Sequence, residues 1–445
     1  MSDVSCGAAA QQATVFICVY SRPFVVQLNG SVSAERFRRE GIRARQNRCK
    51  TNGSTTNPRE SEPHRLVPGE SATARGQGCP PYGPIRGGTR IPTAARKFHD
   101  TVKPVVSILI PAYNAQKWIA ETIQSALAQT WERKEIIVVD DGSTDQTLAI
   151  ARQFSSRGVA VTTQKNAGAA AARNQAFKLC KGDYIQWLDA DDLLSPDKIA
   201  RQIEKAEHDG SRRLLLSSGW GTFYYRLRKA NVSRSPLWCD LLPAEWLFRK
   251  MGQNIHMQTA TWLVSRELTE AAGPWDTRLL GDDDGEYFAR VLMASAGTRF
   301  VAGPTVYYRV SGHGRLSYIG KSDRKMRALF LSMQLHIKYL LSLDDSPRTQ
   351  AACMTYLRNW LPSFYPERLD ILTEAREMAA MLGQPLEIPE ISWKYAWIEA
   401  LCGRQAAKQT QMFYNRRKID VEKLWDRVMF NLERQKQSRP SPRLR

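Results

Sequence analysis

The chain has 445 residues, more than one hydrophobic core usually organises, so we expect two domains or one enlarged α/β domain with appendages. With 42% hydrophobic and 24% charged residues it has a globular composition, which excludes collagen-like and wholly disordered chains. No run approaches the roughly 18 apolar residues of a spanning helix, residues 13–28 lack the basic leader of a secretory signal, and the eight cysteines form no C-x-x-C pair. We therefore predict a soluble cytoplasmic protein without structural zinc.

The net charge of +20 is concentrated at the two ends of the chain. Residues 1–100 hold fifteen Lys and Arg against seven Asp and Glu, and residues 404–445 hold twelve against four. Both ends lack regular apolar periodicity, which is typical of solvated or partner-binding tails. We therefore expect no nucleic-acid partner, and we expect peripheral contact with the inner face of a membrane through anionic lipid.

Residues 1–103 are predicted to be a disordered N-terminal extension, because clusters of Gly, Pro, Ser, Thr and Arg interrupt any helix or strand there. After Met1 the next methionine is Met251. A natural start inside the extension would therefore need another start codon, near Val102, and the N-terminal mass of the natively expressed protein tests this.

Strand-length apolar runs alternate with amphipathic helix-length segments from Pro104 onward. The strands are predicted at residues 105–111, 135–141, 158–163 and 183–189. Asn114 is expected to cap the first helix, and Ser143 with Gln146 to form a capping box at the second. This alternation predicts a doubly wound, largely parallel α/β sheet with ligands at the carboxyl ends of its strands.

The pattern changes in the second half of the chain. Shorter strand-like pieces follow residue 214, among them 258–265, and from about Asp323 the periodicity is helical. We expect four regions: a disordered extension at 1–103, an α/β domain at 104–320, a helical C-terminal region at 321–435 and a basic tail at 436–445.

Carboxylates cluster where two predicted strands end. Asp140 and Asp141 end the second strand, and Asp189, Asp191 and Asp192 end the fourth as LDADD. Burying adjacent carboxylates costs free energy unless a cation offsets their charge. The D-x-D spacing points two side chains the same way, which suits Mg²⁺ or Mn²⁺ shared with phosphate oxygens. The alternative is that these aspartates only form turns and helix caps.

Four motifs then follow one another over residues 104–200. They read VSILIPAYNA, EIIVVDDGSTD, NAGAAAARN and GDYIQWLDADD. In order and spacing they resemble the family 2 glycosyltransferases, and the resemblance continues more loosely to about residue 320. It implies a GT-A fold and the transfer of a sugar from a nucleoside diphosphate sugar with inversion at the anomeric carbon.

The resemblance implies a nucleotide-sugar site at the strand ends. Pro111 and Tyr113 would pack on the nucleotide base, and Tyr113 offers an aromatic face. Asp141 would accept a hydrogen bond from the base, which for uracil is the ring N–H. Arg173 would lie near the nucleotide and help to neutralise the diphosphate.

The resemblance also implies a divalent metal cofactor, Mn²⁺ or Mg²⁺. Asp189 and Asp191 would contact the ribose and the metal, with Asp192 as an alternative ligand. The metal would act as a Lewis acid that stabilises charge on the departing nucleoside diphosphate.

The matching stretch for the catalytic base is GDDDGEYFAR at residues 281–290. Alignment on Arg290 favours Asp284 as the base that removes the acceptor hydroxyl proton, with Asp283 as the reserve. Three consecutive aspartates and Gly285 depart from the E-D pattern of the family, which leaves the register within 282–284 open. The alternative is an acidic helix N-terminus favoured by the helix dipole.

Further candidates lie on either side of that stretch. YYRVSGHGRLS resembles the loop that closes over the diphosphate in the family, where His313 would bind phosphate or metal and Arg309 or Arg315 would pair with phosphate. The alternative for His313 is an ordinary loop residue. Two roles are open for three aromatic residues: stacking on an acceptor sugar or packing in the core, of which core packing is favoured. These residues are Trp262, Trp275 and Tyr287.

Rival enzyme classes lack their sequence signals. PAYNAQ replaces the G-x-G-x-x-G of a dinucleotide-dependent oxidoreductase, and the glycine-rich loop of a sugar nucleotidyltransferase is missing. A processive polysaccharide synthase would carry a Q-x-x-R-W motif and membrane spans, and the sequence has neither. The resemblance implies a transferase that uses a UDP-sugar, with dTDP- and GDP-sugars as alternatives, and a glycan, lipid-linked or protein acceptor. By analogy with the family, it implies a role in cell-envelope polysaccharide assembly. A non-catalytic nucleotide-sugar-binding protein remains the alternative.

Overall fold

The computed structural model describes residues 15–18, 23–26, 103–310, 322–388 and 390–437, which fall in two units, Met1–Pro84 and Ile85–Arg445. In the first unit β1 (Val15–Cys18) and β2 (Pro23–Val26) form an antiparallel pair. The rest of the predicted N-terminal extension and the tail at 438–445 lie outside the described residues.

A five-stranded sheet organises the second unit, in the order β5-β4-β3-β6-β9. Its strands are β3 (Val106–Ala112), β4 (Lys134–Asp140), β5 (Val159–Thr163), β6 (Tyr184–Trp187) and β9 (Val264–Ser265). β3 to β6 run parallel and β9 runs antiparallel to β6. Every residue of β3 is buried, as expected for a central strand covered on both faces.

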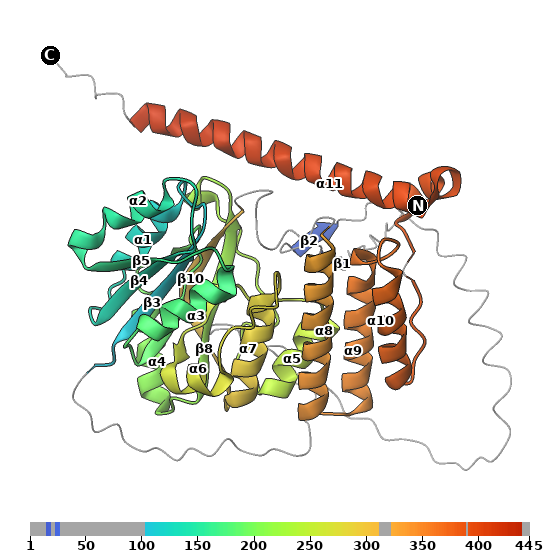
Figure 1. Cartoon of the computed structure of the whole chain (residues 1–445), viewed down its shortest axis with the longest axis horizontal. Coiled ribbons are helices and arrows are strands. Elements are labelled where there is room, and N and C mark those ends of the chain that lie inside the picture. The colour runs from blue at the N-terminus through green and yellow to red at the C-terminus, as the bar shows by residue number, and fades with distance from the viewer. Residues whose placement is uncertain (1–14, 19–22, 27–102, 311–321, 389, 438–445) are drawn as a thin grey trace, which may run out of the picture. The chain divides into compact units, whose positions relative to one another are not determined.

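Helices between these strands cover the sheet (Figure 1). They are α1 (Ile119–Leu127), α2 (Thr147–Arg152), η1 (Ser155–Arg157) and α3 (Ala169–Leu179), whereas α4 (Lys198–Asp209) packs on a second sheet. α3 packs on β3 and β4, and α1 packs on α2. The predicted doubly wound, mostly parallel α/β architecture is confirmed.

A three-stranded sheet stands beside the first, in the order β7-β10-β8. It consists of β7 (Leu193–Leu194), β8 (Leu214–Phe223) and β10 (Gly297–Arg309). β10 pairs in parallel with β8 and antiparallel with β7. Because β7 directly follows the LDADD motif, this pairing brings the end of β10 to that motif.

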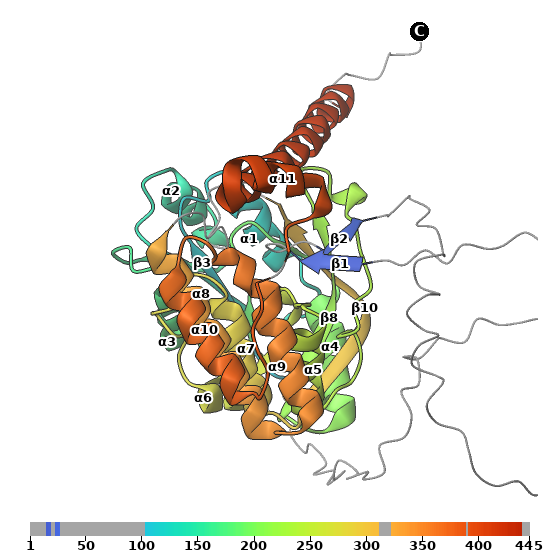
Figure 2. The ribbon, with the colours of Figure 1, turned by 90° about the vertical axis from the view of Figure 1, so that its right-hand side faces the viewer.

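The helical C-terminal region is also confirmed. α8 (Asp323–Leu343), α9 (Pro347–Trp360) and α10 (Leu369–Met381) lie side by side, with η4 (Leu361–Ser363) between the last two (Figures 1 and 2). The helices α5 (Pro243–Gly252), α6 (Arg266–Ala272) and α7 (Asp283–Ala294), with η2 (Leu227–Lys229) and η3 (Thr259–Thr261), precede them. α8 packs on α5 and α7, which joins the helical region to the α/β part.

The last helix, α11 (Trp393–Gln437), is long and interrupted once, at Gly403, where φ is 81° and ψ is 164°. In both views it runs past the tops of α8 to α10 as a rod (Figures 1 and 2). Within the described part of the chain, no helix has the length and apolarity that a membrane crossing requires.

Three local predictions are wrong. Asn114 does not cap α1, whose N-cap is Trp118, and Ser143 forms no capping box at α2. Asn114 Oδ1 instead accepts a hydrogen bond from the Thr144 backbone N–H, and Ser143 Oγ accepts one from the Asn114 N–H, so the two loops hold each other. The piece at 258–265 is not one strand, because it forms η3 before β9.

Candidate active site

The carboxyl ends of β4, β3 and β6 are neighbours at one edge of the sheet. Pro111 lies buried inside β3, opposite Val139 of β4. Tyr113 follows the strand and is 51% exposed. An exposed aromatic ring just beyond parallel strand ends suits the stacking of a nucleotide base.

Asp141 is buried behind this edge and organises the loop before α3. Its Oδ1 accepts hydrogen bonds from Gln164 Nε2 at 2.7 Å and from the Ala167 N–H at 2.9 Å, and its Oδ2 accepts one from the Gly168 N–H at 2.8 Å. A carboxylate has about four acceptor positions. Three are engaged, so Asp141 is held rigidly, and its predicted contact with a base stays a prediction.

Arg173 of α3 joins the two acidic motifs. Its Nη2 donates to Asp189 Oδ1 at 2.8 Å, and its Nη1 donates to Asp283 Oδ2 at 2.6 Å. The guanidinium also lies 4.3 Å from the centre of the Trp275 ring. Burial opposes the charge, but Asp283 and Asp189 outweigh it and raise the pKa of Arg173 above its usual value.

Replacing Arg173 by methionine is expected to destabilise the fold strongly. It leaves the buried Asp283 and the partly exposed Asp189 without their cation, which typically costs about 3–5 kcal/mol. Burial already raises the pKa of Asp283 and Arg173 opposes that rise, so the variant should be least stable at high pH, where the carboxylate is charged.

Urea unfolding at pH 8 and pH 5.5 measures this effect. Arg278→Met is the matched control, because Arg278 is 68% exposed in its ion pair with Asp276 and such exposed pairs contribute little to stability. Equal losses for the two variants would contradict the bridging role of Arg173.

Asp191 and Asp192 are adjacent but differ in surroundings. Asp192 is fully buried, where its Oδ1 accepts a hydrogen bond from the Arg309 N–H at 2.8 Å and its Oδ2 accepts one from Gln258 Nε2 at 2.5 Å. Asp191 is half-buried, and its carbonyl accepts a hydrogen bond from Arg309 Nε at 2.9 Å. Asp192 thus fixes the end of β10, and Asp191 is the more accessible of the two.

The described residues do not form a complete metal cage. Among them, no three His, Cys, Asp or Glu side chains gather closely enough to hold an ion by themselves. Asp189 and Asp191 nevertheless have the chemistry for a shared site, because Mg²⁺ usually binds one or two carboxylates together with substrate phosphates and water. The residues therefore fit a metal that arrives with a diphosphate.

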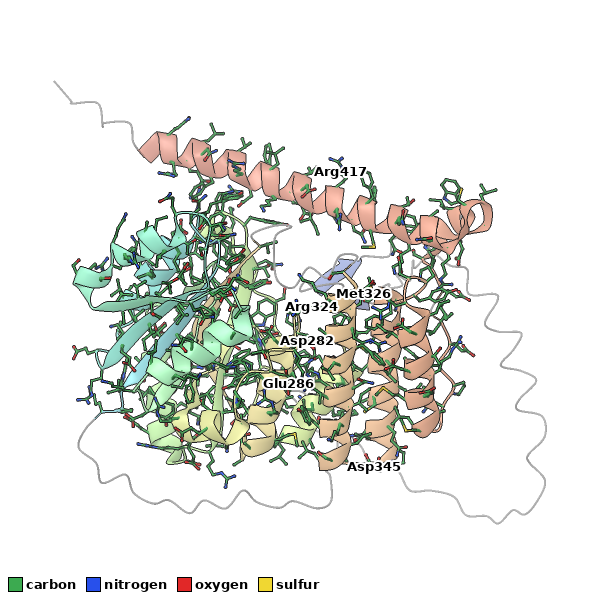
Figure 3. The ribbon with its side chains drawn as sticks, viewed as in Figure 1. Asp282, Glu286, Arg324, Met326, Asp345 and Arg417 are labelled. Carbon is green, nitrogen blue, oxygen red and sulfur yellow. The ribbon has the colours of Figure 1, made fainter. Side chains whose placement is uncertain are left out.

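The three aspartates at the start of α7 point to different partners. Asp282 has a left-handed φ of 56°, and its carboxylate accepts a hydrogen bond from Ser332 Oγ of α8 at 2.6 Å (Figure 3). A Cβ at Gly285 would collide with that carboxylate, which explains the glycine in the motif.

Asp283 is paired with Arg173. Asp284 is half-buried and accepts a hydrogen bond from Thr259 Oγ1 at 3.0 Å.

Asp284 has the protonation chemistry of a general base. Burial and then the nearby carboxylates of Asp283 and Asp282 raise its pKa to about 7, while Arg173 opposes this rise. A base works best when its pKa lies near the working pH. Among the three aspartates, Asp284 combines this pKa with partial exposure, which supports the register that the sequence favours.

The other candidates have different outcomes. Trp262, Trp275 and Tyr287 are at most 2% exposed, and Trp275 stacks on Tyr287 with ring centres 4.0 Å apart, so their packing in the core is confirmed. Arg309 is buried and its Nη2 donates to Glu121 Oε2 at 2.5 Å. His313 and Arg315 lie outside the described residues.

The sequence analysis missed two side chains of η3 and its flank. Thr259 contacts Asp284 and Gln258 contacts Asp192, so this short element joins the base motif to the strand-end motif. Both residues lie in a piece that alternates like a strand, and only a long-range contact distinguishes their role. No local pattern identifies it.

Known proteins share this domain. Residues 107–259 match the model of Glycosyl transferase family 2. An uncharacterized glycosyltransferase of Rickettsia typhi is 35% identical over 173 residues, which are 34% of this chain and 54% of that protein. The UDP-Glc:alpha-D-GlcNAc-diphosphoundecaprenol beta-1,3-glucosyltransferase WfaP of Escherichia coli is 45% identical over 104 residues, 23% of this chain and 41% of that protein.

The similarity to solved structures concerns the fold. Residues 1–349 of TarS from S. aureus, in complex with UDP-GlcNAc, superpose with a TM-score of 0.51 at 18% identity, covering 62% of this chain and 81% of that one. The chain spans about half, or less, of the length of the curated relatives that it matches.

Proposed function

We propose that the chain is a metal-dependent, inverting glycosyltransferase, from the premise that residues 107–259 match the model of Glycosyl transferase family 2. Its donor would be a nucleoside diphosphate sugar, and its acceptor a hydroxyl group of a glycan, lipid-linked or protein substrate. The single observation that carries the proposal is the Arg173 bridge, which sets the partly exposed Asp284, with its raised pKa, beside Asp189.

A UDP-sugar is the donor that we propose. The exposed Tyr113 ring offers a surface on which the base can stack. The Asp141 carboxylate, which is held rigidly, can accept one further hydrogen bond from a ring N–H of the base. WfaP, which resembles this domain, is named for a UDP-glucose donor. His313 belongs to the proposed site as a phosphate-binding residue.

In the proposed step, the acceptor hydroxyl oxygen attacks the anomeric carbon of the donor sugar. The hydroxyl proton passes to the Asp284 carboxylate, and the bond from the anomeric carbon to the diphosphate oxygen breaks, so the electron pair leaves with UDP. Attack opposite to the leaving group inverts the anomeric carbon. Asp283 would keep Arg173 in place rather than take the proton, because Arg173 Nη1 already donates to it at 2.6 Å.

Asp189 and Asp191 would hold the divalent ion, Mn²⁺ or Mg²⁺, with the donor diphosphate completing its coordination. When bound, the ion supplies Lewis-acid stabilisation of the leaving diphosphate. The sequence analysis gave Asp192 as an alternative metal ligand. Both of its carboxylate oxygens already accept buried hydrogen bonds, which favours Asp191 as the ligand.

A lipid-linked acceptor and peripheral membrane contact complete the proposal. WfaP is named for an acceptor on diphosphoundecaprenol, which supports a lipid-linked substrate in cell-envelope polysaccharide assembly. The basic C-terminal segment supports contact with anionic lipid.

Incubation of the purified chain with Mn²⁺ and a panel of nucleotide sugars tests the function. A transferase releases nucleoside diphosphate, and a sugar nucleotidyltransferase instead forms pyrophosphate from a nucleoside triphosphate and a sugar phosphate. Tight nucleotide binding without either product, with every donor and acceptor offered, would indicate a non-catalytic nucleotide-sugar-binding protein.

The pH dependence of kcat/KM is expected to follow Asp284. Its pKa of about 7 means that the basic carboxylate form predominates above pH 7, so kcat/KM should fall about tenfold per pH unit below that value and level off above it. Initial rates between pH 5 and 9 measure the profile. A profile that is flat from pH 5 to 8 would contradict the assignment of the base.

A further inference from the structure

The helix α11 leaves an unusual number of large apolar side chains in solvent. Eleven such residues of α11 are exposed, against eight in all other described parts of the chain, and Trp393, Trp397 and Trp425 are 76%, 63% and 65% exposed. A helix of a soluble domain normally buries its apolar face. Contiguous exposed apolar surface marks a site of interaction.

One face of α11 attaches the helix to the α/β part. Asp426 accepts hydrogen bonds from Arg226 Nε at 2.7 Å and from the Tyr225 N–H at 2.9 Å. Glu433 pairs with Arg226 at 3.2 Å, and the Phe430 ring packs 6.1 Å from that of Tyr225. Positions 426, 430 and 433 lie on one side of a helix, so this side is the inner face.

Five of the eight exposed large apolar residues between Met412 and Leu432 lie on the other side. They recur at intervals of seven, four, three and four residues, which places them on one face. We call this set the outer stripe: Tyr414, Val421, Trp425, Val428 and Leu432, which are 65%, 66%, 65%, 43% and 46% exposed. The inner contacts hold the stripe turned away from the α/β part.

Positive charge accompanies the outer stripe. Arg417 and Lys418 are exposed between Tyr414 and Val421, and Figure 3 labels Arg417. α11 as a whole has ten Lys and Arg against five Asp and Glu. Trp and Tyr rings favour the boundary between water and lipid, and long basic side chains reach from apolar surface to lipid phosphates.

The same charges argue against a second copy of the chain as the partner. Helix pairing along the stripe would bring the exposed Arg417 side chains of two copies toward a desolvated seam, which costs free energy. An anionic lipid surface attracts this charge and covers the apolar residues.

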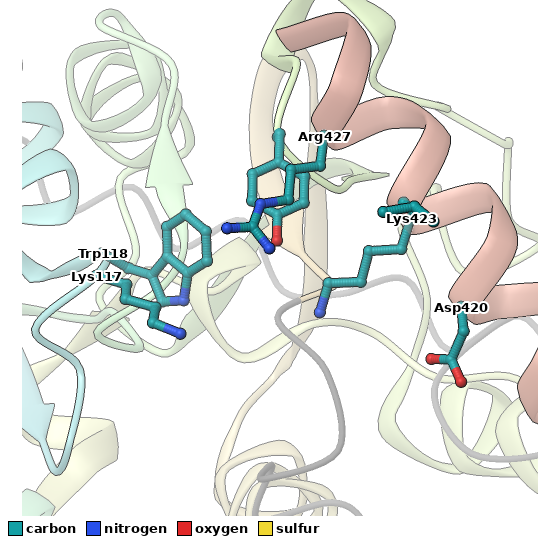
Figure 4. A pocket seen from close by; sticks show the side chains of 7 residues that line it. Lys117, Trp118, Asp420, Lys423 and Arg427 are labelled. Atoms are coloured by element: carbon teal, nitrogen blue, oxygen red, sulfur yellow. The ribbon is translucent and has the colours of Figure 1, made fainter. Parts of the chain in front are cut away.

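A cavity of about 320 Å³ lies between α11 and the residues just before α1 (Figure 4). Lys117 and Trp118 line it from the start of α1, and Lys423 and Arg427 line it from α11. Leu424, which is 61% exposed, belongs to the same wall. Three cations and the carboxylate of Asp420 line this hollow, and the excess of positive charge suits the phosphate of a lipid headgroup.

We propose that α11 is an interfacial helix whose outer stripe lies in the surface of an anionic membrane, with lipid phosphate in the adjoining cavity. This inference names the partner of the proposed function, a surface that carries a lipid-linked acceptor. Because vesicle binding is measured without sugar transfer, a failure of membrane binding by α11 can be distinguished from a failure of the proposed transferase function.

Co-flotation of the full chain with vesicles tests the proposal. We expect binding to vesicles of phosphatidylglycerol and phosphatidylcholine, and at least about tenfold weaker binding to phosphatidylcholine alone. Val421→Ser with Trp425→Ser should lower binding at least about tenfold, and Arg417→Gln about fivefold. Lys423→Gln with Arg427→Gln should weaken binding to phosphatidylglycerol vesicles selectively.

The matched control is Leu369→Ser with Met381→Ser on α10, which removes apolar residues that are 60% and 80% exposed and should leave vesicle binding unchanged. Far-UV circular dichroism checks that the variants are folded. Stripe variants that bind vesicles like the wild type overturn the proposal. A wild-type dimer that dissociates in the stripe variants would also overturn the proposal, because the stripe would then be an interface between two copies of the chain. Binding of soluble pyrophosphate that is lost in Lys423→Gln with Arg427→Gln, and that vesicles do not compete, would overturn the lipid source of the phosphate.

Discussion

Replacing Asp284 by asparagine is expected to lower kcat by about 10²–10⁴-fold while the dissociation constant for the donor changes less than about twofold. Asparagine keeps the shape of the side chain near Thr259 Oγ1, but it has no carboxylate to take the acceptor proton. Steady-state rates of UDP release and calorimetric titration with UDP and Mn²⁺ measure the two quantities.

The stability of the same variant separates loss of a base from loss of structure. Because the pKa of Asp284 is raised to about 7, the native state binds more protons than the unfolded chain between about pH 4 and 7, so stability falls as the pH rises through this range. Asparagine carries no such charge, and the variant should be at least as stable as the wild type at pH 8. Asp197→Asn, on a half-exposed aspartate, is the matched control and should keep full activity. An Asp284→Asn enzyme with normal kcat would refute the role.

Replacing Asp191 by alanine is expected to abolish the metal-dependent part of donor binding. Loss of groups that merely orient metal ligands commonly weakens metal binding about 10–100-fold, and loss of a ligand should cost at least as much. The described residues offer no three-ligand cluster that would compensate. Titration of the variant with UDP should give the same affinity with and without Mn²⁺, whereas the wild type should bind more tightly with Mn²⁺.

Asp192 provides the contrast. Its carboxylate accepts hydrogen bonds from Arg309 and Gln258 in the interior, so Asp192→Asn should lower the free energy of unfolding and keep the response to Mn²⁺. The opposite pattern, with metal response lost in Asp192→Asn and kept in Asp191→Ala, would show that the ligand assignment is wrong.

The parts that follow local rules could be predicted from the sequence. β3 and β4 are continuous apolar runs, and the structure places them within one residue of their predicted bounds. The α/β class and the helical C-terminal region follow from such periodicities. The family resemblance placed Asp189, Arg173 and Asp283 in one predicted site, and the structure joins all three by hydrogen bonds.

Long-range contacts decided what the sequence could not predict. Asn114 and Ser143 are good helix caps by residue type, but each finds a partner on the neighbouring loop, about thirty positions away. Asp191 and Asp192 cannot be distinguished by sequence pattern. The pairing of β7 with β10 brings the Arg309 N–H to the Asp192 carboxylate, which gives Asp192 a structural role. The expectation that residues 404–445 lack regular apolar periodicity is wrong for α11, because Tyr414, Val421 and Trp425 lie on one face of this helix.

Gly285 has a consequence for how this motif can change during evolution. The Asp282 carboxylate occupies the space that a Cβ at position 285 would need, because it turns back toward Ser332. A side chain at 285 must displace the acidic group at 282, so glycine at 285 can be replaced only together with a change at 282. Among homologous chains the two sites should covary, with larger residues at 285 wherever 282 carries a shorter one.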